Sequence, residues 1–592
     1  MNAEVMMTQD LSSEQKRYLE GFASGMAIAR NAAAPPAAAP PQGPDAAALR
    51  AMDEAERAGK KLADQEKWKR KAHPFDEYPR LQAQALAGTF PSPEDNFRWR
   101  YYGLFYVSPA QDSYMLRLRI ANGILRADQM AGLATLAERF SRGAAQVTTR
   151  ANLQMREIVA HDATLVVEAV QDLGLTSRGS GADNIRNVTG SPTAGIDAQE
   201  LLDTRPLARA WHFHVLNDRS LAGLPRKFNV AFDGGGALPV LEETNDIGFQ
   251  AVEVPDGVAG IAPGVWCRLV LGGISGHGDL ARDTGVICRP EQCSGLADAI
   301  LRVFIDKGDR TNRAKARLKY VLDGMGFAAF LELVEARCSF KLQRIDAALL
   351  KPRGPQLRNG HIGVHSQKQA RLNWVGVALP VGRLSAAQMR GLADIAQKFG
   401  DGDLRLTVWQ NLLLSGVRDE DIATVDAAIT ELGLATHASA IACGLVACTG
   451  SAGCKFAAAD TKADALAIAA AVEAELAFDT PLNVHVTGCH NSCAQHYIGD
   501  IGLIGAKVPV NDEGDTAPGY DMVVGGGYGA QARIGRVLRE KIRADEAPAL
   551  VTRMLAAWLA QRSDGDESFA AFANRHDDAA LLKMLLPMDV TE

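Results

Sequence analysis

The chain has 592 residues, of which 47% are hydrophobic and 22% are charged, and its formal net charge is −7 at pH 7. This length suggests about three or four domains with sizeable buried cores, and the net acidity leaves no overall positive field to attract nucleic acid. Nine cysteines, an odd number without loop-rich spacing, argue against a secreted disulfide scaffold and for a reducing compartment.

Residues 1–94 are predicted to form an N-terminal helical arm. The chain begins without the apolar segment of a secretory signal. A Pro/Ala-rich linker is expected at 31–44. Residues 45–71 are predicted to form one charged helix that ends in Lys67-Trp68-Lys69-Arg70-Lys71. We interpret this basic end as a solvated helix face, in preference to a docking site for an acidic protein.

From residue 100 onward, strand and helix patterns alternate, which is typical of an α/β protein. A strand is predicted over 114–120, a helix over about 126–141 and a strand over 145–149. His212 and His214 form an H-x-H pattern on a possible strand, and structural histidines are favoured over metal ligands. No run of about 18 apolar residues occurs, so no membrane span is expected. We therefore expect a cytoplasmic protein that binds neither nucleic acid nor a membrane.

The second half of the chain repeats the first. The order and spacing of several blocks are kept without large gaps, which chance does not produce, so the sequence predicts a duplicated fold. The halves are expected to pack about a pseudo-twofold axis. The matched blocks are 123–153 with 382–412 at an offset of 259, Thr189-Gly190-Ser191 with Thr449-Gly450-Ser451 at 260, and Asp246-Ile247-Gly248 with Asp500-Ile501-Gly502 at 254.

Four of the nine cysteines form two close pairs, Cys448 with Cys454 and Cys489 with Cys493. The pattern is C-x5-C, then 34 residues, then C-x3-C, among glycines and small residues. Four thiolates fit either a [4Fe–4S] cluster or zinc, and the first spacing is looser than zinc pairs usually show. Cys443 precedes Cys448 by five residues and is a rival ligand.

The matching loops of the first half carry cations instead of thiols. Asp183-Asn184-Ile185-Arg186 and Arg226-Lys227-Phe228-Asn229 stand where the second half has its cysteines. A metal centre that faces these loops would lie beside a basic pocket, which suits a small anion or an acidic cofactor. The candidate cations are Arg117, Arg150, Arg156, Arg186 and Lys227.

At these motifs the chain resembles the nitrite and sulfite reductases that contain sirohaem and a [4Fe–4S] cluster, over about residues 95–575. The resemblance implies an α/β (α+β) fold with mixed sheets, internally duplicated and pseudo-twofold, in three domains. It divides the chain into ferredoxin-like half-domains at 95–165 and 355–420, a first-repeat domain at 166–354 and a second-repeat domain at 421–592. The motifs that carry it are Met115-Leu116-Arg117-Leu118-Arg119, Thr148-Thr149-Arg150-Ala151-Asn152-Leu153-Gln154, Asp183-Asn184-Ile185-Arg186-Asn187, Leu224-Pro225-Arg226-Lys227-Phe228-Asn229, Gln410-Asn411 and the cysteine pairs.

The resemblance also implies roles for individual residues. The four cysteines would hold the cluster, and Cys493 would also bridge to the sirohaem iron. The position of Asn229 carries lysine in typical sulfite reductases, so asparagine favours nitrite. His490 departs from the usual proline after the third cysteine, and could tune the cluster by hydrogen bonding. The anion pocket would comprise Arg117, Arg186, Lys227 and Asn229, and the sirohaem contacts Arg150, Gln154, Arg156, Gln410 and Asn411.

The activity implied by the resemblance is six-electron reduction of nitrite to ammonia, with reduced ferredoxin as the electron donor and a monomeric enzyme. Assimilatory sulfite reductase, with the same cofactors, is the first alternative. A cobalamin-pathway oxygenase on the same scaffold and a non-enzymatic, zinc-stapled binding protein are the others.

Overall fold

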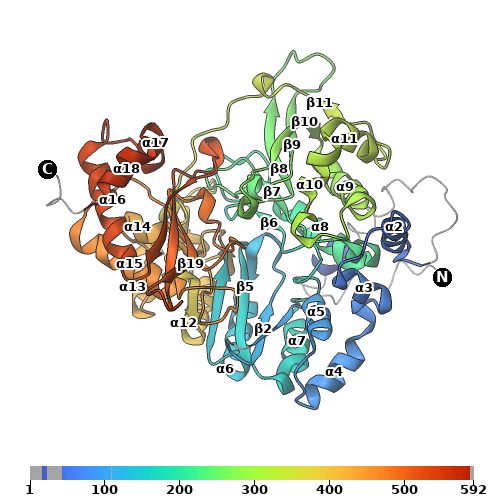
Figure 1. Cartoon of the computed structure of the whole chain (residues 1–592). Coiled ribbons are helices and arrows are strands. Elements are labelled where there is room, and N and C mark those ends of the chain that lie inside the picture. The colour runs from blue at the N-terminus through green and yellow to red at the C-terminus, as the bar shows by residue number, and fades with distance from the viewer. Residues whose placement is uncertain (1–16, 23–42, 109, 587–592) are drawn as a thin grey trace.

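Four β-sheets with helices around them make up the described part of the chain (Figure 1). The computed structural model describes residues 17–22, 43–108 and 110–586. Two sheets belong to the halves matched at offset 259, and each is followed along the chain by a larger sheet with longer strands. Most of the predicted linker, 31–42, lies outside the described residues. None of the helices in the described part of the chain is long and apolar enough to cross a membrane.

The N-terminal region contains two helices where one was predicted over 45–71. Helix α2 spans Ala46–Arg57 and α3 spans Asp64–Lys71. Gly59, with φ +74°, follows α2 in the left-handed conformation that ends helices. The prediction of a single helix was therefore wrong. Helices α4 (Tyr78–Leu86) and α5 (Pro93–Trp99) follow.

The first two sheets exchange a strand with each other. Strand β14 of the second half pairs with β4 of the first, with Leu384 opposite Ala145. Strand β3 of the first half pairs with β15 of the second, with Leu125 opposite Leu404. The orders are β1 (Leu104–Val107), β2 (Ser113–Arg117), β5 (Asn152–Ile158), β4 (Ala144–Thr148), β14 (Arg383–Ser385), and β12 (Gly363–Ser366), β13 (Leu372–Val377), β16 (Leu412–Arg418), β15 (Asp403–Leu406), β3 (Ile124–Arg126).

Helix packing also repeats between the halves. The position of a Cβ on Gly132 of α6 (Ala127–Phe140) is taken by the side chain of Leu173, and that on Gly391 of α12 (Ala386–Phe399) by Leu432. Both pairs keep the offset of 259. The predicted helix over 126–141 and the strand over 145–149 are confirmed as α6 and β4. Helices α7 (Ala163–Asp172) and α13 (Ile422–Glu431) complete these halves.

The two larger sheets share one topology, in which three parallel strands are followed by antiparallel ones. In the first, β6–β7–β8 are parallel and β8–β9 antiparallel; in the second, β17–β18–β19 are parallel and β19–β20 antiparallel. The predicted mixed sheets and internal duplication are confirmed. The strands are β6 (Thr189–Gly190), β7 (Val230–Asp233), β8 (Ile247–Val254), β9 (Gly264–Leu271), β10 (Arg282–Cys288) and β11 (Gln343–Arg344), and β17 (Leu445–Ala447), β18 (Val484–Thr487), β19 (Ile501–Pro509), β20 (Thr516–Val524) and β21 (Arg536–Arg543).

Helices cover the larger sheets and supply much of their cores. Helix α9 (Cys293–Lys307) is buried along most of its length. His212 and His214 lie on helix α8 (Arg205–Asn217), so their predicted place on a strand was wrong. His214 Nε2 lies 2.8 Å from Asp298 Oδ1, and both side chains are buried. The remaining helices of this part are α10 (Leu318–Met325), α11 (Phe327–Glu335), α14 (Ala440–Cys443), α15 (Thr461–Glu475), α16 (Ala547–Gln561), α17 (Phe569–Arg575) and α18 (Asp578–Met584).

Candidate functional site

The parallel pairing of β17 and β18 brings the two cysteine pairs to one sheet edge. Cys448 directly follows β17, and its backbone N–H donates to Val486 of β18 at 3.0 Å. Cys489 follows the end of β18 by two residues. Cys448 interacts electrostatically with Cys493, and Cys489 with both Cys493 and Cys454. The structure therefore brings together all four cysteines that the spacing singled out.

All four of these cysteines are free thiols, and protein groups donate to two of them. The N–H of Gly488 donates to Cys448 Sγ at 3.2 Å, and the Asn491 amide donates to Cys489 Sγ at 3.5 Å. Burial, and then the nearby Cys493, raise the pKa of Cys448 to about 11. A bound cation removes such a penalty because it favours the thiolate.

Two neighbouring residues are separate from this thiol group. Cys443 ends helix α14, and its Sγ donates to the Ala438 carbonyl at 3.5 Å, so it is not a fifth member. His490 is exposed. Asn491, not His490, supplies the hydrogen bond to the Cys489 sulfur.

The predicted cations meet at the same place from four different elements. Arg117 ends β2, Arg150 follows β4, and Arg186 and Lys227 lie in the loops before β6 and β7. Each is half-buried. Cys493 interacts electrostatically with Arg117, Arg150 and Lys227, while Arg186 interacts with Arg117 and Arg150. The fold therefore joins the cation loops of one half to the thiol edge of the other.

No carboxylate in the described part of the chain pairs with Arg117, Arg150, Arg186 or Lys227. Among the described residues, Lys227 Nζ has no hydrogen bond or ion pair. The guanidinium of Arg117 lies 4.7 Å from the Phe105 ring centroid, and Arg186 donates only to backbone carbonyls at 2.6 and 2.8 Å. Desolvation, followed by neighbouring cations, lowers the pKa values of Lys227 and Arg186 well below their usual range. An anion in this pocket would relieve that repulsion.

Asn229 lies beneath the cations and is almost fully buried. Its backbone N–H donates to Asp246 Oδ2 at 2.9 Å. In the amide orientation that satisfies both its oxygen and its nitrogen, the oxygen accepts from Arg150 at 2.9 Å and from Arg317 at 3.2 Å. Asp246 also forms an ion pair with Arg317 at 2.6 Å. Asn229 thus orients Arg150 through its side-chain oxygen.

The remaining predicted contacts divide into two groups. Gln154 donates to Thr449 Oγ1 at 3.3 Å, and Arg156 donates to the Gly453 carbonyl, so both contact the loop of the first cysteine pair. Gln410 instead donates to Val147 and accepts from the Ala447 N–H, and Asn411 accepts from the Leu379 N–H. Both amide atoms of Gln410 and the amide oxygen of Asn411 are bonded to backbone groups, so their predicted cofactor role gains no support from these contacts.

Comparison with known families follows the same division of the chain. The family model described as "Nitrite and sulphite reductase 4Fe-4S domain" matches residues 181–342 and 442–572. The family model described as "Nitrite/Sulfite reductase ferredoxin-like half domain" matches residues 107–173 and 365–432. The chain belongs to the nitrite and sulfite reductase family.

Individual members of the family align with most of the chain. Ferredoxin–nitrite reductase of Synechococcus elongatus is 36% identical, over 77% of this chain and 88% of that protein. The assimilatory ferredoxin-dependent nitrite reductase of Haloferax mediterranei is 30% identical, over 88% of this chain and 93% of that protein. The Mycobacterium tuberculosis NirA protein superposes with a TM-score of 0.80 at 28% identity, covering 88% of this chain and 97% of that one.

The residues of this nitrite and sulfite reductase fit the cofactors of the family. Four adjacent thiols with backbone and amide donors suit a [4Fe–4S] cluster. Half-buried cations without carboxylate partners suit the acidic periphery of sirohaem. Arg156 shows the fit most directly, because its Nε and Nη1 are buried without a partner in the described structure. A bound carboxylate would satisfy them.

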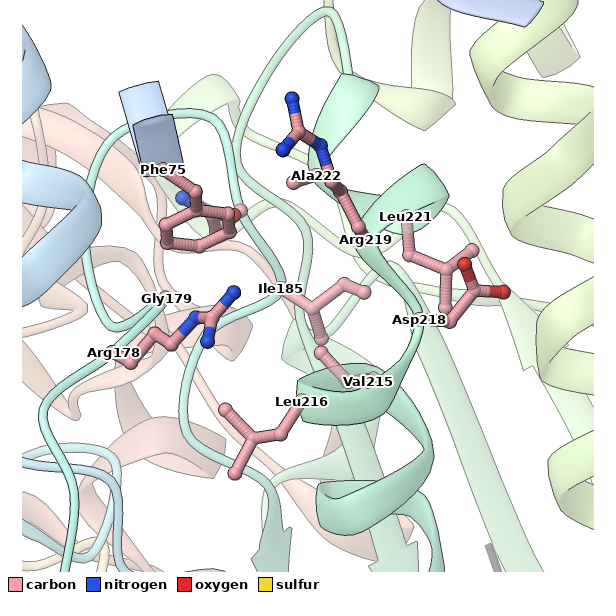
Figure 2. A pocket seen from close by; sticks show the side chains of 11 residues that line it. Phe75, Arg178, Gly179, Ile185, Val215, Leu216, Asp218, Arg219, Leu221 and Ala222 are labelled. Carbon is pink, nitrogen blue, oxygen red and sulfur yellow. The ribbon is translucent and has the colours of Figure 1, made fainter. Parts of the chain in front are cut away.

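Sequence reasoning missed two parts of the surroundings in this reductase. Arg317 acts on Lys227 and pairs with Asp246, but it lies far along the chain, on a segment without a motif. Behind the Arg186 loop is a cavity of about 20 Å³ between Ile185 and Phe75, room for one water (Figure 2). It is too small for a cofactor, and the Arg178 guanidinium covers the Phe75 ring at 4.2 Å.

Proposed function

We propose that this protein reduces nitrite to ammonia in six electrons, at a sirohaem coupled to a [4Fe–4S] cluster, with reduced ferredoxin as donor. The observation that carries the proposal is the contact between unlike halves. Thr149 Oγ1 of the first half donates to the carbonyl of Cys493, the fourth cysteine, at 2.9 Å, and Cys493 interacts electrostatically with Arg117, Arg150 and Lys227. A thiol-bound redox centre beside a group of unpaired cations suits the reduction of a small anion.

The bound cofactors would supply single electrons and an open iron position for the anion. Cys448, Cys454, Cys489 and Cys493 would hold the cluster, and Cys493 would also bridge to the sirohaem. Arg150 and Arg156 would hold sirohaem carboxylates, and Gln154 would keep the adjoining cysteine loop in place.

The chain's own contribution to the reaction is charge and protons. Arg117 and Arg186 would attract nitrite and hold its oxygens, because they keep their protons and present planar donors. Lys227 would donate protons, since desolvation and neighbouring cations lower its pKa well below the usual value. The negative charge of bound nitrite would offset part of the repulsion between these cations and so favour the protonated form of the Lys227 amine.

The test is an absorption spectrum of the purified protein, followed by nitrite and sulfite assays with reduced methyl viologen. We expect a sirohaem spectrum, about four cluster irons per chain and a higher kcat/KM for nitrite. A colourless protein that contains zinc would contradict the reductase proposal. A coloured protein that prefers sulfite would support the proposed cofactors and contradict nitrite as the proposed substrate.

Asn229 provides a second test of the substrate. Asn229→Lys would put an ammonium group against Arg150 and Arg317, the two guanidinium groups that its amide oxygen now accepts from. Like charges at this spacing repel, so we expect weaker nitrite turnover and a lower nitrite-to-sulfite ratio. Asn229→Gln keeps the amide and is the control. An unchanged ratio in Asn229→Lys would remove Asn229 from the specificity argument.

We also propose a monomeric, cytoplasmic enzyme that binds ferredoxin through surface cations. Light scattering of the purified chain tests the first point, and cell fractionation tests the second. Turnover with reduced ferredoxin should fall as ionic strength rises, while turnover with methyl viologen should change little, because only protein docking depends on screened surface charge.

A further inference from the structure

Helix α3 buries charged residues in place of apolar ones. Glu66 is 1% exposed and Lys69 is 7% exposed, and they are the two buried residues of the helix. Lys67, on the same helix, pairs at the surface with Asp64, and its side chain is 45% exposed. Buried charges need partners. Glu66 pairs with Lys69 and with Arg310, and Lys69 in turn reaches the two loops that carry Arg186 and Lys227.

Lys69 joins those two loops. Its Nζ contacts Asp183 Oδ2 at 3.4 Å and donates to the Leu224 carbonyl at 2.8 Å. It also forms an ion pair with Glu66. Asp183 is three residues before Arg186, and Leu224 is three residues before Lys227. One side chain of the N-terminal region therefore holds both cationic loops.

Two arginines from the segment that follows helix α9 complete the network. Arg313 grips Asp183 through two hydrogen bonds at 2.7 and 2.9 Å. Arg310 pairs with Glu66 at 2.6 Å and donates to the Gly223 carbonyl at 2.8 Å. The α3 clamp, as we call Glu66, Lys69, Asp183, Arg310 and Arg313, thus ties helix α3 to both loops.

The position of Asp183 sets that of Arg186 through short backbone links. Arg186 Nη2 donates to the carbonyl of Ala182, which holds the left-handed conformation at φ +50°. The Arg186 N–H donates to the Phe228 carbonyl at 2.8 Å, and the Phe228 N–H donates to Asn184 at 3.1 Å. Backbone hydrogen bonds therefore join the two loops to each other.

From these contacts we infer that helix α3 positions the anion pocket, with Lys69 as the positioning residue. Lys69 acts on Arg186 through Asp183 and on Lys227 through the Leu224 carbonyl. This inference rests on the proposed function, because it assigns the pocket to the substrate anion.

Removing Lys69 does not leave an unpaired charge behind. Without it, Glu66 keeps Arg310 and Asp183 keeps Arg313. Lys69→Met keeps a long unbranched side chain. The α3 clamp has three cations and two carboxylates, so the substitution changes its net charge from +1 to zero. We therefore expect the variant to fold and bind its cofactors, with the loops less firmly held.

The experiment is a nitrite titration of the oxidised holoenzyme, followed by the sirohaem absorbance. Residues that orient binding groups at a redox centre change affinity by about tenfold or more, so Lys69→Met should raise the nitrite Kd by about tenfold. Sirohaem and iron contents should stay at the wild-type level. Lys67→Met, on the exposed face of the same helix, is the matched control and should leave the Kd unchanged.

Glu66→Gln is the second variant, because it keeps the side-chain shape while weakening the attachment of Lys69. It should also raise the Kd. An unchanged nitrite Kd in a cofactor-loaded Lys69→Met protein would overturn the inference, as would an unchanged Kd in Glu66→Gln if Lys69→Met does not fold. If the wild type binds sulfite but not nitrite, the proposed function fails, and the same titrations with sulfite still test the clamp.

Discussion

Arg150 and Trp409 occupy equivalent positions in the two halves of the chain, 259 residues apart. Each lies within the turn between paired strands, β4 and β5 for Arg150, β15 and β16 for Trp409. The next residue has a positive φ in both, 46° at Ala151 and 60° at Gln410. Arg150 belongs to the group of cations that also contains Arg117, Arg186 and Lys227. Trp409 is 2% exposed and lies within 4.7 Å of the Tyr528 ring centroid and 5.7 Å of that of His361.

The polar support of the pocket is also duplicated. In the first half, Asp246 Oδ2 accepts from the Asn229 N–H at 2.9 Å and pairs with Arg317. In the second, Asp500 Oδ2 accepts from the Asn483 N–H at 2.7 Å and pairs with Arg358 at 2.8 Å. The second half thus keeps the framework of the site, while Trp409 and its aromatic neighbours fill the space.

Trp409→Ala should destabilise the protein without creating a second cofactor site. Truncating a buried tryptophan costs about 3–5 kcal/mol of unfolding free energy, and no cation replaces it. Denaturant unfolding measures the loss, and the sirohaem-to-protein ratio should stay at the wild-type value. Trp409→Phe retains the stacking and should cost less. A doubled sirohaem content in Trp409→Ala would show that the aromatic side chains alone exclude a second cofactor.

The sequence was sufficient to predict the duplication and the meeting of the thiol loops with the cation loops, because each left a local pattern at a matched offset. The mixed sheets were expected from the family resemblance instead. It was insufficient for Lys69, which looks like any solvated lysine in a basic run. Its partner Asp183 is 114 residues away, and long-range ion pairs leave no local periodicity. The H-x-H pattern led to a wrong prediction of a strand for a different reason. Residues two apart share a face on a strand, but on helix α8 they do not.

Cys493→Ser should separate the cluster from the sirohaem. Serine lacks the soft thiolate that a shared ligand requires, so we expect loss of nitrite turnover and of any magnetic coupling in EPR spectra. Cys443→Ser is the matched control. The Cys443 thiol bonds only the Ala438 carbonyl in the described structure, and its replacement should keep iron content and activity. A fully active Cys493→Ser enzyme would be incompatible with the bridging role.

Lys227 should control the alkaline limb of the pH–rate profile. Its pKa lies well below the usual value because of desolvation and then Arg317, and the protonated form is the donor, so kcat should fall as pH rises through that pKa. Lys227→Met should lower kcat by about a hundredfold and remove this limb. Lys227→Arg keeps the charge but does not release its proton, so it should retain nitrite binding and lose turnover.

Asp183 should contribute to stability above its pKa and lose that contribution in acid. Desolvation opposes its ionisation, but Lys69 and Arg313 outweigh this and lower its pKa from 3.8 to about 2. A folded-state pKa below the unfolded one stabilises the native state above the unfolded pKa, and the gain disappears as pH falls from about 4 towards about 2. The difference corresponds to about 2 kcal/mol. Urea unfolding of wild type and Asp183→Asn at neutral pH and at about pH 3 measures it, and the gap between them should narrow in acid. Asp64→Asn, at an exposed pair on α3, should show little change. An equal gap at both pH values would mean that Asp183 stabilises the fold without its charge.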